Sequence, residues 1–263
     1  MKKLTAVVLA LLIALAAFAA LAEESEPDLL ARIRERGTLV IATEGNWPPW
    51  TYHDENDVLT GLDIEIGRLI AEGLGVEPDY RETAWDAILA GVESGRFDIA
   101  CNGVGYTETR AEKYSFSTPY VYTAKVLVVR GDNEDIHTVE DLAGKITANS
   151  PSSTYAMLAE EYGASVTYIN TLDETIQLLL QGRADATINA RASIEGYLES
   201  HPEADIRIVQ ELPGDPVAYP MRKDDDAQSL VAAVDEILEQ ARQDGTLAEI
   251  SLRYFGEDRT RPE

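Results

Sequence analysis

The chain has little of the chemistry that disulfides, metal sites and nucleic-acid binding require. Its 263 residues include one cysteine, so no intramolecular disulfide can form, and only three histidines. His53, His137 and His201 lie in polar, turn-like stretches without metal-ligand or catalytic spacing. Basic residues are scarce as well, 22 against 47 acids, for a formal net charge of -25. Since nucleic acids need a basic surface, we expect no nucleic-acid partner, and we expect neither a metal nor a cofactor.

Long apolar runs are also missing, except at the N-terminus, where one extends from Leu4 to Leu21. Lys2 and Lys3 precede this run, and Ala20-Leu21-Ala22 has the small-x-small pattern of a cleavage site. The pattern predicts a signal peptide over residues 1–22. The alternative is an uncleaved anchor, because the run is just long enough to span a membrane. Either way we expect export, to a periplasm or to the cell surface.

Beyond residue 22, apolar strand-like runs alternate with segments of helical periodicity. The expected strands cover 38–42, 97–101, 121–130, 145–149, 165–169 and 184–188. The expected helices cover 61–75, 84–95, 153–163, 171–182 and about 226–243. Such alternation predicts an α/β protein built from parallel strands and crossover helices.

Two segments of the chain repeat one another. "GRFDIACN" (95–102) and "GRADATIN" (182–189) share Gly, Arg, Asp and Asn at matching places, each after a helix of similar length. The repeat is either a coincidence between two common turns or the mark of two similar lobes. In the second case Asn102 and Asn189 end equivalent strands and face one cleft from opposite sides, because open α/β sheets bind ligands beyond the carboxyl ends of their strands.

The segment "CNGVGYTETR" (101–110) combines two glycines with an arginine. A nucleotide-binding loop is excluded, because the Walker pattern and the third glycine of a dinucleotide fingerprint are both missing. Cys101 ends an apolar strand and is expected to be packing, not a nucleophile. Gly103, Gly105 and Arg110 suit a carboxylate, which the glycines would admit to the backbone and the guanidinium would bind with two hydrogen bonds. The alternative is that Arg110 is an ordinary surface arginine.

Two further segments suggest a pocket. "EGNWPPW" (44–50) follows the first strand, and its tryptophans, with Trp85, either line a pocket or anchor the loop to the core. "SPSSTY" (150–155) precedes a helix that Ser153 or Thr154 can cap. The N–H groups at that helix start would favour an anion, or they mark an ordinary helix cap.

From "TLVIATEGNWPPWTYHD" through "GRFDIACNGVGYTETR" to "DGTLAEISLRYFGED", the chain resembles the periplasmic solute-binding proteins, family 3, of polar amino-acid ABC transporters. "SPSSTY" and "GRADATIN" look most like the cystine-binding branch. The resemblance implies the type II periplasmic-binding-protein fold, in which two α/β lobes with mostly parallel sheets are joined by two hinge strands. Lobe 1 would be 23–126 plus 217–263, lobe 2 would be 127–216, and the hinge would lie near Val126–Arg130 and Val217–Met221.

By position, the resemblance implies that Arg110 binds the α-carboxylate of the ligand, that Trp47 and Trp85 enclose its side chain, and that Glu44 contacts the polar end. Backbone groups at Gly103, Gly105 and Thr154 would assist Arg110, and Asn102 and Ser150 would line the cleft. With Ser153 and Asn189 from the patterns above, these form the predicted site. Where relatives have an aspartate for the ammonium group of the ligand, this chain has Ala190, so another acid, a water or a different ligand has to take its place.

The resemblance therefore implies a monomeric, non-enzymatic binding protein that delivers a polar amino acid, with cystine favoured, to a membrane permease. Two alternatives stay open. One is an enzyme like the cyclohexadienyl dehydratases, which share this fold, and the other is a binding protein for an amine-free carboxylate.

Overall fold

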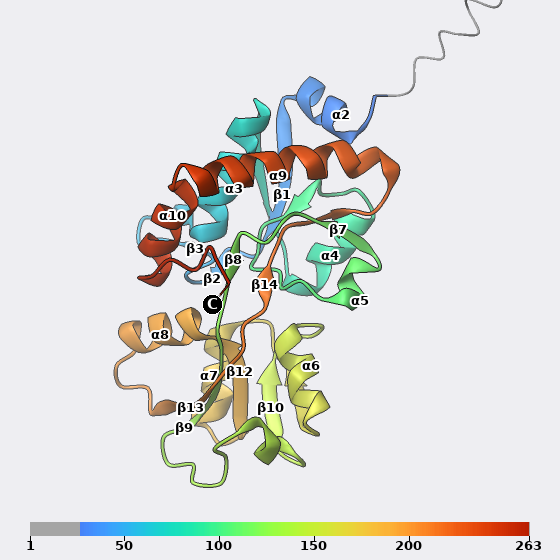
Figure 1. Cartoon of the computed structure of the whole chain (residues 1–263). Coiled ribbons are helices and arrows are strands. Elements are labelled where there is room, and N and C mark those ends of the chain that lie inside the picture. Colours follow the sequence, from blue (N-terminus) through green and yellow to red (C-terminus); the bar gives the residue numbers. More distant parts are fainter. Residues whose placement is uncertain (1–26, 263) are drawn as a thin grey trace, which may run out of the picture.

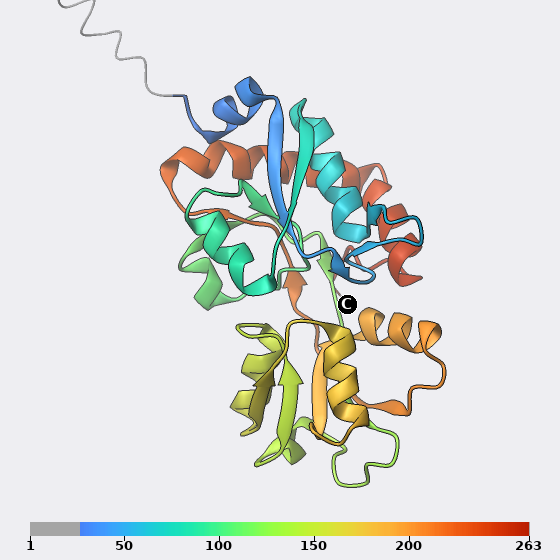
Figure 2. The ribbon, with the colours of Figure 1, turned by 180° about the vertical axis from the view of Figure 1, so that it is seen from behind.

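The structure is a computed structural model that describes residues 27–262, so the predicted signal peptide lies outside the described residues. The chain forms two α/β lobes, one above the other in Figures 1 and 2. Each lobe contains one five-stranded sheet, ordered β5-β1-β6-β15-β7 in the upper lobe and β11-β10-β12-β9-β13 in the lower. In both sheets the first three strands are parallel and the last two are antiparallel to their neighbours.

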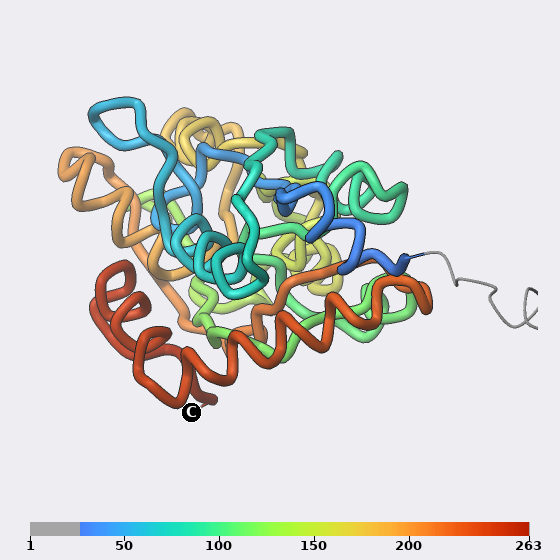
Figure 3. The backbone as a smooth tube through the Cα atoms, turned by 90° about the horizontal axis from the view of Figure 1, so that it is seen from above, coloured from blue at the N-terminus to red at the C-terminus, as the bar shows by residue number. Residues whose placement is uncertain are grey.

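The upper lobe is built from both ends of the described chain. Its sheet consists of β1 (Thr38–Thr43), β5 (Glu77–Glu82), β6 (Ile99–Ala100), β7 (Tyr114–Phe116) and β15 (Pro220–Arg222). A small sheet beside it contains β2 (Asn46–Trp47), β3 (Thr51–His53) and β4 (Leu59–Thr60). The helices are α2 (Leu29–Arg36), α3 (Leu62–Leu74), α4 (Trp85–Glu93), α5 (Glu108–Ala111), η2 (Asp225–Ala227), α9 (Gln228–Gln243) and α10 (Thr246–Phe255). The sequence did not predict α10, which with α9 runs along one side of the molecule in Figure 3.

The lower lobe is one continuous stretch of chain. Its sheet consists of β9 (Lys125–Arg130), β10 (Ile146–Asn149), β11 (Ser165–Tyr168), β12 (Ala186–Ala190) and β13 (Ile206–Leu212). Its helices are η1 (Val139–Leu142), α6 (Thr154–Glu161), α7 (Leu172–Leu180) and α8 (Arg191–Ser200). The strand expected at 184–188 begins later, at Ala186, because the Asp185 side chain accepts the Ile146 N–H.

The repeated segments occupy equivalent places in the two lobes. β6 and β12 are the third strands of their sheets, and each follows a helix, α4 or α7, that ends near a left-handed glycine. The shared aspartates also do the same work: Asp98 accepts the Val40 N–H and Asp185 accepts the Ile146 N–H, each at the start of the neighbouring strand. The repeat is therefore a structural one and not a coincidence.

Two short segments, one through Thr123 and one through Gly214, connect the lobes next to the expected hinge strands. The predicted strand 121–130 is interrupted at Thr123, so that β8 (Val121–Tyr122) pairs with β14 (Pro216–Val217) between the lobes while β9 belongs to the lower sheet. Of the residues expected to form the hinge, Val217 lies in β14, and most of the others belong to β9 and β15. The connecting segments pass so closely that a Cβ on Gly214 would lie 1.3 Å from the Thr123 carbonyl oxygen, which requires glycine there.

The apolar cores of the lobes are separate. Two buried clusters flank the upper sheet, centred on residues such as Ile41 and Ile88, and two flank the lower sheet around Ile176 and Ile188. Since each lobe buries its own apolar surface, either can stay folded while the two move relative to one another. Within residues 27–262, no helix has the length and apolar character needed to cross a membrane.

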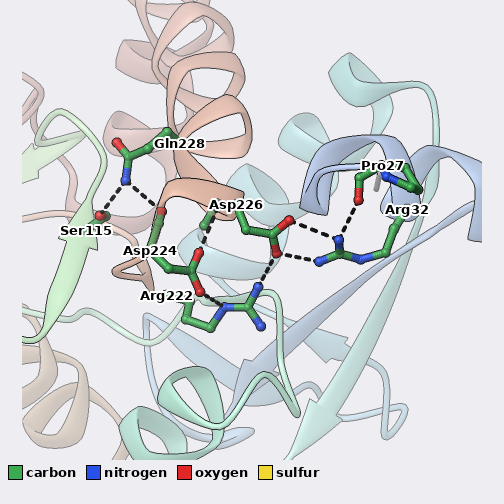
Figure 4. A network of polar contacts seen from close by, with 8 residues as sticks. Pro27, Arg32, Ser115, Arg222, Asp224, Asp226 and Gln228 are labelled. Carbon is green, nitrogen blue, oxygen red and sulfur yellow. Dashed lines mark hydrogen bonds and ion pairs between the residues drawn. The ribbon is translucent and has the colours of Figure 1, made fainter. Parts of the chain in front are cut away.

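A charged network holds the first described helix to the C-terminal part of the upper lobe, remote from the inter-lobe region. Asp226 Oδ2 accepts hydrogen bonds from Arg32 Nη2 and from Arg222 Nη2, each at 2.5 Å (Figure 4). Arg222 also pairs with Asp224 at 2.5 Å. The network thus links α2 to β15 and η2, which are distant from it in sequence.

Candidate functional site

A cavity lies between the two lobes. Ten of the predicted site residues line it: Glu44, Trp47, Trp85, Gly103, Gly105, Arg110, Ser150, Ser153, Thr154 and Asn189. The first six come from the upper lobe and the other four from the lower lobe. The cavity thus collects residues that lie after the parallel strands of both sheets, as expected for open α/β sheets.

Arg110 is the central cation of the cavity and not a surface arginine. It lies in α5, where the Thr107 side chain caps the helix by accepting the Arg110 N–H, and it is 7% exposed. Nη1 donates to the Gly105 carbonyl at 2.7 Å, and Nη2 crosses the cleft to the Ser152 carbonyl at 2.9 Å. No carboxylate forms an ion pair with it among residues 27–262. Burial lowers the pKa of the guanidinium, the charge of nearby Asp215 acts in the opposite direction, and the guanidinium stays protonated. The cavity therefore holds a buried cation that forms no ion pair within the described part of the chain.

Gly103 is fixed beneath the cavity by a buried carboxylate. Its N–H donates to Asp63, which also accepts the hydroxyl protons of Tyr120 and Tyr219. Burial raises the pKa of Asp63 to about 6. The Gly103 N–H therefore already has an acceptor within the protein. Glycine is nevertheless required here, since φ is 57° and a Cβ would lie 2.7 Å from the Trp47 ring.

Asn102 does not line the cavity as predicted. It is fully buried, and it holds Glu44 from below: its Oδ1 accepts the Glu44 N–H at 2.8 Å and its Nδ2 donates to Glu44 Oε2 at 2.7 Å. The Glu44 carboxyl lines the cavity itself. Burial raises its pKa to about 7, with the Asn102 amide and the Trp85 N–H acting in the opposite direction. Near neutral pH, Glu44 can thus accept hydrogen bonds from a ligand or donate one.

The three tryptophans divide between the cavity and the core. Trp47 and Trp85 line the cavity, whereas Trp50 is buried behind Trp47 with the two ring centroids 5.3 Å apart. Trp50 also contacts Phe255 edge-on at 5.2 Å, which anchors the loop to α10. Trp85 lies 5.5 Å from the Arg110 guanidinium carbon, close enough for a cation–π contact. The cavity therefore has an aromatic wall next to its cation.

The lower lobe contributes mainly hydrogen-bonding groups. Ser153 caps α6 by accepting the Ala156 N–H. The N–H group of Thr154, the first residue of the helix, has no acceptor within the helix because no turn precedes it. Asn149, at the end of β10, donates to Thr187 and to the Ile188 carbonyl. Its Oδ1 is buried and has no hydrogen-bond partner among residues 27–262. A donor on a bound molecule would satisfy it.

Several lining residues escaped prediction from the sequence. They are Asn46, Thr123, Asn149, Tyr155, Asn170, Thr171, Leu172, Thr175, Asp215 and Val217. Asn149 and Asn170 follow parallel strands, so the rule that located Asn189 could have found them. Asp215 gives no such signal, because its turn, "LPGDPV", reads as an ordinary loop. Among residues 27–262, no group of three or more His, Cys, Asp or Glu side chains is placed to hold a metal ion.

Two lobes with a buried cavity between them are the arrangement of a protein that binds a small solute. Residues 39–257 match the family of bacterial extracellular solute-binding proteins, family 3, and the chain belongs to this family. Its fold is accordingly the type II fold of periplasmic binding proteins.

Three similar proteins illustrate the range of the family. A probable amino-acid ABC transporter-binding protein of Haemophilus influenzae is 37% identical over 89% of this chain and 90% of its own. The L-cystine-binding protein TcyA of Bacillus subtilis is 38% identical over 88% and 86%. The crystal structure of the ancestral amino acid-binding protein AncCDT-1, a precursor of cyclohexadienyl dehydratase, superposes with a TM-score of 0.77, at 29% identity, over 87% of this chain and 99% of its own.

Proposed function

We propose that this protein is the extracytoplasmic solute-binding component of an amino-acid ABC transporter, and that it binds a polar amino acid in the cavity between its lobes. The observation that carries the proposal is the buried Arg110 guanidinium, which has backbone carbonyls as partners but no carboxylate. A buried charge without an ion pair is costly, and the carboxylate of an amino acid would supply one with two parallel hydrogen bonds.

The neighbours of Arg110 suit the same ligand. The start of α6 offers the Thr154 N–H and the positive end of the helix dipole to the carboxylate. Trp47 and Trp85 provide flat apolar surface for the ligand side chain. Glu44 would hydrogen-bond its polar end.

Cystine is the favoured ligand within this class. The TcyA relative is named as an L-cystine-binding protein, and the identity of 38% supports a related ligand.

The ligand would act by changing the balance between open and closed forms. The Arg110 side chain already spans the cleft to the Ser152 carbonyl, so a carboxylate bound there contacts both lobes. A ligand shifts such an equilibrium only as far as it prefers one form. We propose that the closed, liganded monomer docks on the membrane permease, and that the lobes meet near residues 126 and 217.

One second candidate function has a specific observation in its favour. AncCDT-1 is described as a precursor of cyclohexadienyl dehydratase, and Glu44 is a carboxyl group in the cavity whose pKa is raised to about 7, as a general acid requires. Incubation with prephenate and an assay for phenylpyruvate tests this activity directly. Turnover that disappears in Glu44→Gln would replace the transport proposal.

A thermal-shift screen tests the binding proposal. The panel contains the proteinogenic amino acids, L-cystine and amine-free carboxylates. A ligand that binds only the native state raises the unfolding free energy, by about 2.7 kcal/mol at a concentration of a hundred times its Kd. The melting temperature rises with it. We expect polar amino acids, L-cystine first, to give the largest shifts. If only amine-free acids stabilise the protein, its ligand is not an amino acid.

A further inference from the structure

The cavity must also accommodate the ammonium group of an amino acid, and residue 190 cannot bind it. Ala190 ends β12, is 1% exposed, and does not line the main cavity. Apart from Glu44, the only acidic residue that lines the cavity within residues 27–262 is Asp215. This residue lies in the second connecting segment, immediately before β14.

Asp215 lies close to the carboxylate-binding end of the cavity. A Cβ on Gly105 would be 3.4 Å from both Cβ and Oδ2 of Asp215, so the carboxylate lies against the Gly105 backbone. Arg110 donates to the carbonyl of the same glycine at 2.7 Å. Cation and anion therefore flank one residue. An α-amino acid carries its carboxylate and ammonium groups on a single carbon, so it needs two opposite charges placed this near each other.

Asp215 is at present paired with an internal cation. Lys125 Nζ lies 2.8 Å from Asp215 Oδ1, with side-chain exposures of 12% for Lys125 and 24% for Asp215. Lys125 begins β9, where its strand neighbour across the ladder is Ala190. Its ammonium is the same chemical group as that of an amino acid. The carboxylate of Asp215 has a second oxygen, Oδ2, which faces Gly105 and lacks an ion-pair partner among the described residues.

We infer that Asp215 binds the α-ammonium group of the ligand, and that Lys125 holds this carboxylate in place and competes for it when the cavity is empty. This assignment rests on the proposed amino-acid ligand. It moves the amine contact from the lower sheet to the connecting segment between the lobes. A ligand bound by Arg110 and Asp215 then contacts the segment that must bend when the lobes move.

Titration calorimetry with a matched ligand pair tests the inference. The pair is L-cystine and 3,3′-dithiodipropionic acid, the same disulfide diacid without its ammonium groups. If the screen selects another amino acid, that amino acid and its amine-free analogue take their place. The variants are Asp215→Asn, Lys125→Met and the double variant, which removes both charges and so excludes repulsion by an unpaired lysine.

We expect Asp215→Asn to weaken L-cystine binding by at least about 30-fold, the lower end of what loss of one partner of a buried charge pair costs. The double variant should lose affinity as well, because the carboxylate is missing in both. Binding of the amine-free diacid should change less than threefold, and this also shows that the variants are folded. Lys125→Met should bind L-cystine as tightly as the wild type or more tightly, since the competing cation is gone.

Three results overturn the inference while leaving the proposed function intact. The first is an equal loss of affinity for both diacids in Asp215→Asn, and the second is no loss of affinity for either. The third is a loss of L-cystine affinity in Lys125→Met as large as in Asp215→Asn, which would make the ion pair a structural link between the connecting segments. If the wild type binds the amine-free diacid but no amino acid, the proposed function itself fails.

Discussion

Replacing Arg110 with methionine should abolish ligand binding without unfolding the protein. The guanidinium is buried, and its partners are the carbonyl groups of Gly105 and Ser152. Methionine keeps much of the side-chain volume and the contact with Trp85 but removes the charge. The substitution thus separates the role of Arg110 in binding from its role in packing.

Arg110→Met should change the ligand affinity far more than it changes the unfolding free energy. A bound carboxylate left buried without its cation costs about 2–5 kcal/mol, so we expect Kd to rise by between about 30-fold and several thousand-fold. In the free protein, Arg110→Met removes two hydrogen bonds, each worth about 1 kcal/mol net, but it also removes a desolvated charge that has no carboxylate partner. These terms oppose one another, so the unfolding free energy should change by no more than about 2 kcal/mol.

The assay combines calorimetry with the amino acid found in the screen and urea unfolding of the unliganded protein. Arg110→Lys keeps the charge but not the bidentate geometry, so its Kd should lie between the values for the wild type and for Arg110→Met. Cys101→Ala is the control, because the thiol is fully buried behind the site and should leave Kd unchanged. If Arg110→Met binds within threefold of the wild type, Arg110 is not the carboxylate partner and the site assignment is refuted.

Three other substitutions test separate parts of the structure. Glu44 has its pKa raised above its ordinary value of 4.5 to about 7, so its contribution to stability is fully present below about pH 4.5 and is lost as the pH rises through 7. The melting temperature of the unliganded wild type should therefore lose a component over this interval that is absent in Glu44→Gln; identical pH profiles would contradict the raised pKa. Gly103→Ala places a Cβ 2.7 Å from the Trp47 ring at a φ of 57°. It should lower the unfolding free energy in urea by at least about 1–3 kcal/mol and weaken ligand binding. An unchanged Kd would show that the loop is not part of the site. Asp226→Asn breaks the ion pairs with Arg32 and Arg222, whose side chains are partly exposed. It should lower the unfolding free energy by about 1 kcal/mol or less and leave Kd unchanged. A higher Kd would show that this remote network is coupled to the cavity.

The sequence predicted the architecture because its signals are local. The alternation of strands and helices follows from side-chain periodicity within single segments, and the repeat of "GRFDIACN" in "GRADATIN" reflects the same turn and the same aspartate bond in each lobe. Arg110, Trp47 and Thr154 could be found for a similar reason, since each follows a strand or begins a helix, and those positions meet at one edge of a sheet.

Pairwise relations across the chain were decided only by the tertiary structure. Whether Asn102 faces the cavity or supports Glu44, and whether the Gly103 N–H faces a ligand or Asp63, depends on which partner lies nearer in space. The sequence also predicted one strand over 121–130, because an apolar run does not show where a strand changes partners at Thr123. The proposed role of Asp215 depends on two contacts that only folding creates: Lys125, distant in sequence, lies 2.8 Å from its carboxylate, and the carboxylate lies against Gly105. Local patterns determine elements, whereas a binding site depends on distances between elements, which the packing of the two lobes alone sets.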